Sequence, residues 1–300
     1  MDLLSRSRLG TVGGMTVRVG RIGVWVSSRF LREGEAAGFA AGVEELGYET
    51  LWIGAAPGDL RLVEEMLAAT SRLTVATGIV NIWTEPAAVA AEAFARVSRE
   101  HPDRLLLGIG AGHGAIIGER YRRPYLQLEA YLDELDAFEP PVPTSDRVLA
   151  ALGPRVLGLA RDRAAGAHPY LVTPEHTRQA RAVLGSGPVL APEQTVVLES
   201  DPDRARATAR QFIGRYLPLA NYTNNWRRLG FTDEDLADGG SDRLVDALVA
   251  WGDEEAILTR VRDHHAAGAD HVCVQPVVSG SGLPIAELRA LAVAGATARS

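Results

Sequence analysis

The sequence contains no lysine, since all 31 of its Lys and Arg residues are arginine. This absence excludes Schiff-base aldol chemistry, a pyridoxal-phosphate linkage and the lysine-dependent phosphate loop, because each of them needs a primary amine. Arginine remains suited to the forked, two-bond recognition of phosphate or carboxylate. The chain can therefore still bind anionic ligands, but not through lysine.

Cysteine and long apolar runs are also scarce. The single cysteine, Cys273, lies in the apolar run HVCV and is expected to be a small buried hydrophobic residue without a redox role. No apolar run approaches the roughly 18 residues of a membrane span, and the N-terminus lacks the apolar core of a secretory signal. We therefore expect a cytoplasmic protein that does not enter a membrane.

The charge pattern excludes two further classes of function. Charges of both signs are interleaved, the net charge is −7, and no basic stripe occurs, so nucleic acid is not an expected partner. Metal-dependent barrel hydrolases usually carry ligating histidines at the end of the first strand, whereas this chain has VWVSS there. No cluster with metal-ligand spacing occurs elsewhere, so no catalytic metal is expected.

Short apolar runs alternate with segments of helical period, which predicts alternating strands and helices. Eight strand candidates in this alternation predict an α/β fold, a (β/α)8 TIM barrel with its active site at the carboxyl ends of the strands. A doubly wound open sheet is the competing architecture, but no GxGxxG follows the first strand. The predicted strands are Val19–Val26, Thr50–Gly54, Leu73–Ile82, Arg104–Gly110, Val148–Leu152, Ala167–Val172, Thr195–Leu198 and His271–Gln275.

One segment interrupts this alternation. Residues 216–252 have a helical pattern and no predicted strand, and we interpret them as a helical cap inserted after the seventh strand. The whole chain, 1–300, is then a single barrel domain, a size that such barrels commonly reach. The main predicted helices are Glu33–Leu46, Asp59–Ala69, one beginning at Pro86, one around Leu128–Leu135, Pro154–Arg163, Pro174–Leu184, one after Asp201, Glu254–Ala267 and Pro284–Ala294.

The stretch RLLLGIGAGH, which ends the fourth strand, carries the most functional information. Gly108, Gly110 and Gly112 remove side chains where another backbone or a flat ligand comes close. His113 then lies just beyond the strand end, on the catalytic face, and is the candidate catalytic residue. The alternative is an ordinary histidine in a surface loop.

Two other features lie at the same face of the predicted barrel. At Leu152 a strand turns directly into a helix through Gly153, Pro154 and Arg155, which suits either an anion or an ordinary helix start. Asn81 ends an otherwise apolar strand and is expected to face the mouth.

Three tryptophans, Trp25, Trp52 and Trp83, fall in or just after the first three strands. They suit either the walls of a site for a stacked aromatic ligand or the ordinary filling of a barrel.

The segment TVATGIVNIWTEPAAVAAEAFARVSREHPDRLLLGIGAGH resembles the luciferase-like flavin and deazaflavin oxidoreductases, in particular the branch that uses coenzyme F420. The similarity continues through AALGPRVLGLARDRAAGAHPYLVTPEHT to the eighth strand. The resemblance implies a barrel that holds an isoalloxazine-like ring at its mouth. It also implies a bulge on the third strand with a non-prolyl cis peptide, which corresponds to Gly78–Ile79 here.

The resemblance further implies site residues and marks departures from the family. Gly110, Ala111, Gly112 and His113 match the segment along the cofactor, and Leu152 to Arg155 match a turn that faces a phosphate. Sugar-phosphate dehydrogenases of the group carry an acidic proton donor where this chain has His113. They also carry an Asp-His pair after the second strand, where this chain has GAA, so glucose-6-phosphate oxidation is not expected.

The main hypothesis is hydride transfer between deazaflavin F420 and a small organic substrate. The protein would supply orientation, a water-poor mouth and a proton from His113. Two alternatives are an FMN-dependent luciferase-like monooxygenase on the same barrel and a non-catalytic protein that stores or delivers a deazaflavin. The resemblance also implies a homodimer.

Overall fold

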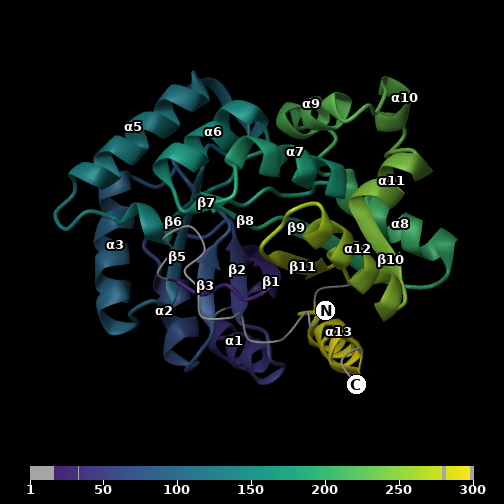
Figure 1. Ribbon diagram of the computed structural model, residues 1–300, viewed down its shortest axis with the longest axis horizontal. Helices are drawn as coiled ribbons and strands as arrows, with labels where there is room; N and C mark the ends of the chain where they lie inside the picture. The colour runs from purple at the N-terminus through teal and green to yellow at the C-terminus, as the bar shows by residue number, and fades with distance from the viewer. Residues whose placement is uncertain (1–16, 33, 279–281, 298–300) are drawn as a thin grey trace.

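Short runs of buried residues form the strands of one curled parallel sheet (Figure 1). The computed structural model describes residues 17–32, 34–278 and 282–297. In these residues the strand order is β10-β9-β11-β1-β2-β3-β5-β6-β7-β8, with β4 beside β5. The strands are β1 (Ile22–Ser27), β2 (Thr50–Gly54), β3 (Thr74–Thr77), β4 (Val80–Asn81), β5 (Leu105–Gly110), β6 (Arg147–Leu149), β7 (Gly166–Ala167), β8 (Val189–Leu190), β9 (Glu193–Leu198), β10 (Val249–Gly252) and β11 (Val272–Pro276).

The sheet closes into a barrel through residues 189–198. On one side β8 pairs with β7, and on the other side β9 pairs with β11. Backbone hydrogen bonds also join the two sides between these pairings. The amide of Asp270 donates to the carbonyl of Leu190, and the amide of Cys273 donates to the carbonyl of Pro192. With β3 and β4 counted as one strand, β8 and β9 as another, and β10 left aside, the barrel has the predicted eight strands. The (β/α)8 prediction is confirmed.

Most strands differ from the prediction by one or more residues at their ends, and the seventh and sixth strands differ for reasons that the structure shows. The seventh was predicted at Thr195–Leu198 but begins at Val189, and Pro192, which has no amide hydrogen, divides it into β8 and β9. The sixth was predicted at Ala167–Val172 but is only two residues long. Leu171 has a positive φ of 54°, so the chain has left the extended conformation by this point.

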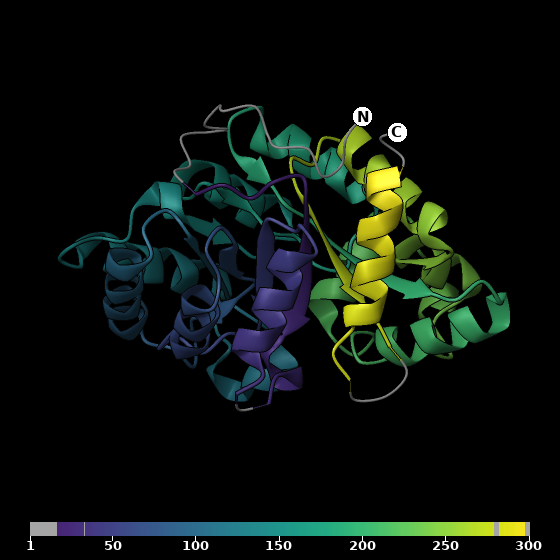
Figure 2. The same ribbon diagram turned by 90° about the horizontal axis from the view of Figure 1, so that it is seen from below.

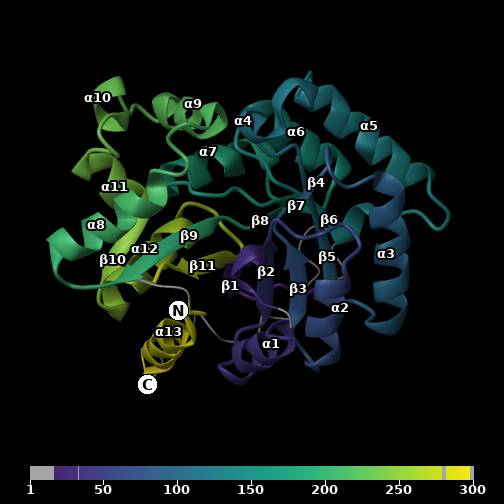
Figure 3. The ribbon, with the colours of Figure 1, turned by 180° about the vertical axis from the view of Figure 1, so that it is seen from behind.

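Helices surround the barrel (Figures 1 and 3), and α13 completes the ring by contacting α1 and α12 (Figure 2). The predicted start of α1 at Glu33 lies outside the described residues. Among the helices of the described ranges, none is long and apolar enough to span a membrane. The helices are α1 (Ala36–Glu45), α2 (Arg61–Ala68), α3 (Ala87–Glu100), α4 (Gly114–Ile117), α5 (Pro124–Ala137), α6 (Pro154–Arg163), α7 (Pro174–Leu184), α8 (Pro202–Ile213), α9 (Ala220–Arg228), α10 (Asp233–Leu236), α11 (Asp242–Leu248), α12 (Glu254–Ala266) and α13 (Ile285–Thr297), with short 3-10 turns η2 (Ser28–Phe30), η3 (Gly118–Arg120) and η4 (Thr144–Asp146).

The segment 216–252 contains α9, α10 and α11, and it also contains β10, which the sequence did not predict. This strand was missed because Val249 continues the apolar run that ends α11, with no turn residue between them. The cap packs with α8 in a second hydrophobic cluster, separate from the main core of the barrel. Its fully buried members include Ala205, Ala209, Ile213, Trp226, Leu244, Val245, Leu248 and Val249.

The third strand has the bulge that the resemblance implies. Ala76 pairs with Leu106 and Val80 pairs with Ile109, so one extra residue lies between these pairs on the third strand. The Gly78–Ile79 bond, however, is trans, because the only cis peptide in the described residues is Glu139–Pro140. The prediction of a cis bond between Gly78 and Ile79 is therefore wrong. In the trans form the Gly78 amide donates to the Ile53 carbonyl at 2.7 Å, so the bulge is held without the roughly 3–4 kcal/mol cost of a non-prolyl cis bond.

The glycines of β5 are required by atoms of the protein itself. A Cβ on Gly108 would lie 1.8 Å from the carbonyl oxygen of Thr77, so another backbone does come close. A Cβ on Gly110 would lie 2.8 Å from Ala150 and from Ile79. These two glycines let the third, fourth and fifth strands pack closely and are not evidence for a ligand.

We predict that Gly108→Ala destabilises the protein by about 1–3 kcal/mol or more, because the added methyl group overlaps the backbone of the third strand. The matched control is Gly158→Ala in α6, where a Cβ meets no atom within 4 Å. The control should be neutral or should stabilise by about 0.4–1 kcal/mol, since alanine restricts the unfolded chain. Urea denaturation measures both changes, and equal stabilities of the two variants would contradict the assignment.

Candidate active site at the barrel mouth

The residues that the sequence predicted as the site lie in two neighbouring groups at the carboxyl ends of the strands. In the first group, Asn81 pairs with Gly110 and lies against Gly112, where a Cβ would be 2.5 Å from the Asn81 amide nitrogen. Ala111 accepts a hydrogen bond from the Trp83 indole at 2.8 Å. The second group, Leu152 to Arg155, follows the next strand, β6. Both groups border the same side of the mouth.

His113 lies at the start of α4 and faces the cap. Its Nδ1 donates to Oδ1 of Asn221 at 3.2 Å, and its ring lies 5.2 Å from the Tyr222 ring. Burial lowers the pKa of His113 below 6.5, and the hydrogen bond to Asn221 opposes this shift only in part. The imidazole is therefore neutral at pH 7, with its lone pair on Nε2. Asn221 was not predicted, because it lies in the cap segment.

The turn at Gly153 carries positive charge. Gly153 caps α6 without a side-chain hydrogen bond, so the amides of the first helical turn are available to an anion. A Cβ on Gly153 would lie 3.8 Å from a guanidinium nitrogen of Arg228, and the Arg155 guanidinium lies 4.3 Å from the centre of the Tyr125 ring. In the described part of the chain neither arginine has a carboxylate within 4.0 Å. Arg228, in α9, was also missed by the sequence analysis.

His176, at the start of α7, holds the turn at Gly153 through a hydrogen bond to its backbone. Its Nε2 donates to the carbonyl of Leu152 at 2.8 Å, and the side chain is buried. Burial lowers the pKa of His176, so the ring is neutral. The residue positions the turn and does not face a ligand.

Four aromatic side chains, Trp25, Tyr170, Tyr216 and Tyr222, fill the centre of the mouth, and we call them the aromatic plug. The ring centres of Trp25 and Tyr170 are 4.9 Å apart, and Tyr216 lies 5.6 Å from Tyr170 and 5.1 Å from Tyr222. Tyr170 packs against both the hydrophobic cluster inside the barrel and the cluster of the cap. The plug thus joins the barrel to its cap.

Trp25 covers the place where the resemblance implies that the flat ring of a cofactor lies. A Cβ on Gly54 would be 2.1 Å from the Trp25 indole, and one on Gly78 would be 3.0 Å from its Nε1. The Trp25 Nε1 and the His168 Nε2 both face Gly78, and neither of these buried nitrogens has a hydrogen-bond partner among the described residues. After what the resemblance implies, we call Leu152 to Arg155 the phosphate turn and the place over Gly54 and Gly78 the ring seat. The unpaired arginines at the phosphate turn fit an anionic cofactor tail, whereas Trp25 closes the ring seat in this conformation.

Glu193 lies below the plug, inside the barrel. Its carboxyl oxygens accept hydrogen bonds from the Leu171 amide at 2.9 Å and from the Thr195 hydroxyl at 2.6 Å. Burial raises the pKa of Glu193 to about 8, and these hydrogen bonds oppose the shift only in part. Cys273 is buried nearby, as expected. Within the described ranges no three His, Cys, Asp or Glu side chains gather as metal ligands.

The family model described as luciferase-like monooxygenase matches residues 20–138, which include Asn81, Gly110 to Gly112 and His113. The resemblance that the sequence indicates is thus confirmed over this segment. A search of curated protein sequences gives no significant match.

Solved structures with the same fold include proteins that use different cofactors. An F420-dependent secondary alcohol dehydrogenase, solved with an F420-acetone adduct, has a TM-score of 0.70 at 15% identity and covers 90% of this chain and 97% of its own. The coenzyme F420-dependent tetrahydromethanopterin reductase of Methanopyrus kandleri has a TM-score of 0.65 at 15% identity, with 90% and 96% covered. The 3,6-diketocamphane monooxygenase of Pseudomonas putida, solved with FMN, has a TM-score of 0.60 at 15% identity, with 92% and 96% covered. The fold is therefore the luciferase-like barrel.

We predict that Glu193 makes stability fall as pH rises. The unfolded chain loses this proton near 4.5 and the folded protein near 8, so the stabilisation is complete below pH 4.5 and is lost as the pH rises towards 8. The slope is about 1.4 kcal/mol per pH unit. Glu193→Gln should flatten this slope in urea denaturation across the range, whereas Glu92→Gln, on the exposed face of α3, should not. Parallel curves for wild type and Glu193→Gln would show that Glu193 is ionised in the folded state.

Proposed function

We propose that this protein is an oxidoreductase that transfers a hydride between deazaflavin F420 and a small organic substrate at the mouth of the barrel. The observation that carries the proposal is the positively charged turn at Gly153, set in a luciferase-like barrel. The sequence resemblance to the F420 branch supports F420 over FMN.

The protein's part in binding is electrostatic. The free amides at the start of α6, together with Arg155 and Arg228, would hold the phosphate of the cofactor. When bound, the cofactor supplies the hydride donor or acceptor. The main chain of Gly110 to Gly112 would form the wall along it, because the space beside these glycines is already filled from the other side by Ile79, Ala150 and Asn81.

His113 would move the proton that accompanies hydride transfer. Since Asn221 fixes the hydrogen on Nδ1, Nε2 is the free position and accepts a proton when the substrate is oxidised. Tyr222 covers one side of the imidazole and helps to exclude water. The sequence analysis expected His113 to donate a proton, and the neutral ring instead supports an acceptor at neutral pH.

The ring end of the cofactor does not fit the conformation seen here, because the Trp25 indole covers Gly54 and Gly78. Binding of the cofactor ring therefore requires the Trp25 side chain to move away. The alternative proposal, an FMN-dependent monooxygenase, would need the same movement of Trp25. It is supported by the solved FMN-containing monooxygenase with this fold. The homodimer that the resemblance implies is also a proposal, which sedimentation velocity checks.

Titration of the purified protein with F420 and, separately, with FMN tests the proposal. We expect saturable binding of F420 with a change in tryptophan fluorescence, because Trp25 has to leave its position. Arg228→Gln should weaken F420 binding about tenfold or more through loss of a charged hydrogen bond. Arg204→Gln, an exposed arginine paired with Glu199, is the control and should change nothing. Saturable binding of neither cofactor would end the proposal, and binding without turnover of any substrate would favour a deazaflavin carrier.

His113→Ala should lower turnover by on the order of 100-fold and leave cofactor affinity unchanged, because the variant removes a proton acceptor and no cofactor contact. His101→Ala, at the end of α3 and the opposite face of the barrel, is the matched control. The wild-type rate should rise with pH through a value below 6.5 and then level off. If turnover, affinity and the pH profile all survive the substitution, His113 is an ordinary surface-loop histidine.

A further inference from the structure

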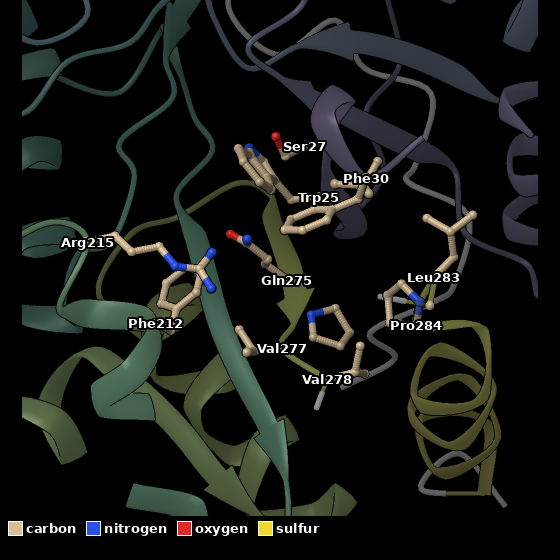
Figure 4. A pocket seen from close by; sticks show the side chains of 13 residues that line it. Trp25, Ser27, Phe30, Phe212, Arg215, Gln275, Val277, Val278, Leu283 and Pro284 are labelled. Carbon is tan, nitrogen blue, oxygen red and sulfur yellow. The ribbon is translucent and has the colours of Figure 1, made fainter. Parts of the chain in front are cut away.

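A cavity of about 90 Å³ lies at the carboxyl ends of β1 and β11, between the end of α8 and residues 282–284 (Figure 4). It opens beside the aromatic plug, because Trp25 forms one of its walls. His113 is not among the described residues that line it. The cavity therefore lies on the catalytic face of the barrel. The residues of the phosphate turn, 152–155, are not among the described residues that line it.

The walls of the cavity are largely aromatic. Trp25, Phe30 and Phe212 line it from three different elements, and Figure 4 shows their rings around the central space. Phe30 is 46% exposed and is one of several large apolar side chains on the described surface. A ligand that covers Phe30 would remove this apolar surface from water. The flat faces of the rings favour a flat, apolar ligand body.

Besides the Ser27 hydroxyl, which accepts from the Arg29 amide, two polar side chains of the cavity offer hydrogen-bond donors. Gln275 is only 6% exposed, and its Oε1 already accepts from the Tyr170 hydroxyl at 2.8 Å. Its amide hydrogens meet no acceptor in the described part of the chain. The Arg215 guanidinium has no carboxylate within 4.0 Å in the same part of the chain, and Figure 4 shows both side chains directed towards the cavity. Two side chains with unused donors therefore line the same aromatic space.

The charge of the cavity selects the sign of the ligand. Arg215 is the only charged residue among the described residues that line it. Arg29 also lies close enough to act on the neighbouring Tyr216, as Arg215 does. A set of donors with positive charge and no acidic residue is complementary to a group that only accepts hydrogen bonds and carries negative charge. A carboxylate meets both conditions.

The volume limits the size of the ligand. At about 10–15 Å³ for each water-sized group, the cavity holds roughly six to nine such groups. That is enough for one ring with a carboxylate and too little for the three fused rings of a flavin. We propose that this cavity binds a small aromatic carboxylate, with its charged group between Arg215 and Gln275 and its ring among Trp25, Phe30 and Phe212.

Binding at the cavity stands independently of the cofactor. That the bound carboxylate is the substrate of the redox reaction rests on the proposed function, because the cavity and the ring seat share Trp25. The two claims separate experimentally, since carboxylate binding is measured without any cofactor.

The test is titration of the full chain with benzoate and with benzamide, which has the same shape and no charge, followed by calorimetry and by tryptophan fluorescence. We expect saturable benzoate binding, about tenfold or more tighter than that of benzamide. Arg215→Gln should abolish this preference and leave benzamide binding unchanged, and Arg215→Lys should restore part of it. Arg204→Gln, in α8, which ends two residues before Arg215, removes an arginine that is paired with Glu199 and should behave as wild type.

Equal affinities for benzoate and benzamide, no saturable binding of benzoate, or an unchanged preference in Arg215→Gln would each overturn the proposal. Gln275→Glu, which places a second negative charge at the donor end, should weaken benzoate binding further than Gln275→Leu. If benzoate binds as expected but neither F420 nor FMN does, the carboxylate site stands and the proposed oxidoreductase function fails. If F420 binds and benzoate does not, only the carboxylate site fails.

Discussion

The contact between Tyr170 and Trp25 holds the mouth of this barrel closed and fixes what surrounds it. Tyr170 donates its hydroxyl hydrogen to Gln275 and must therefore accept the hydrogen of Tyr216, since the two hydroxyl oxygens are 2.8 Å apart. Leaving that hydroxyl buried and unpaired would cost about 1–3 kcal/mol. The hydrogen bond from Tyr170 occupies the side-chain carbonyl oxygen of Gln275, so the NH2 group of Gln275 is the part left for the cavity. The donor end of the cavity is thus set by the packing of the plug.

The barrel could be predicted from the sequence because its strands are short apolar runs separated by helices with clear ends. The regions that were wrong are those where a local signal was missing or misleading. Pro192 interrupts the seventh strand and hid its first half, and β10 follows α11 without a turn. The glycines of β5 were correctly expected to mark a close approach. That the neighbour is the backbone of Thr77 at Gly108 follows only from the strand register, which a bulge shifts by one residue.

The candidate site was predictable only as far as the barrel geometry reaches. His113 and the turn at Gly153 were assigned to the catalytic face because every strand of a parallel barrel ends there. Their partners Asn221 and Arg228 come from the cap, whose sequence has no period that relates it to the barrel. The sequence indicated that Trp25 either lines a site for an aromatic ligand or fills the barrel. That its ring lies across Gly54 and Gly78 depends on side-chain packing that strand periodicity does not contain.

Three arginines beside the mouth have no carboxylate partner within the described ranges. The chain has a net charge of −7, and many of its arginines form ion pairs, yet Arg155, Arg215 and Arg228 have no carboxylate partner in the described ranges. In a chain without lysine, these three guanidinium groups offer the forked geometry that suits phosphate and carboxylate groups. The phosphate turn and the aromatic cavity lie on the same face with this unpaired charge. The mouth thus offers unpaired cations at two places, one beside the helix amides at Gly153 and one beside the aromatic walls of the cavity, which is what two separate anions would require.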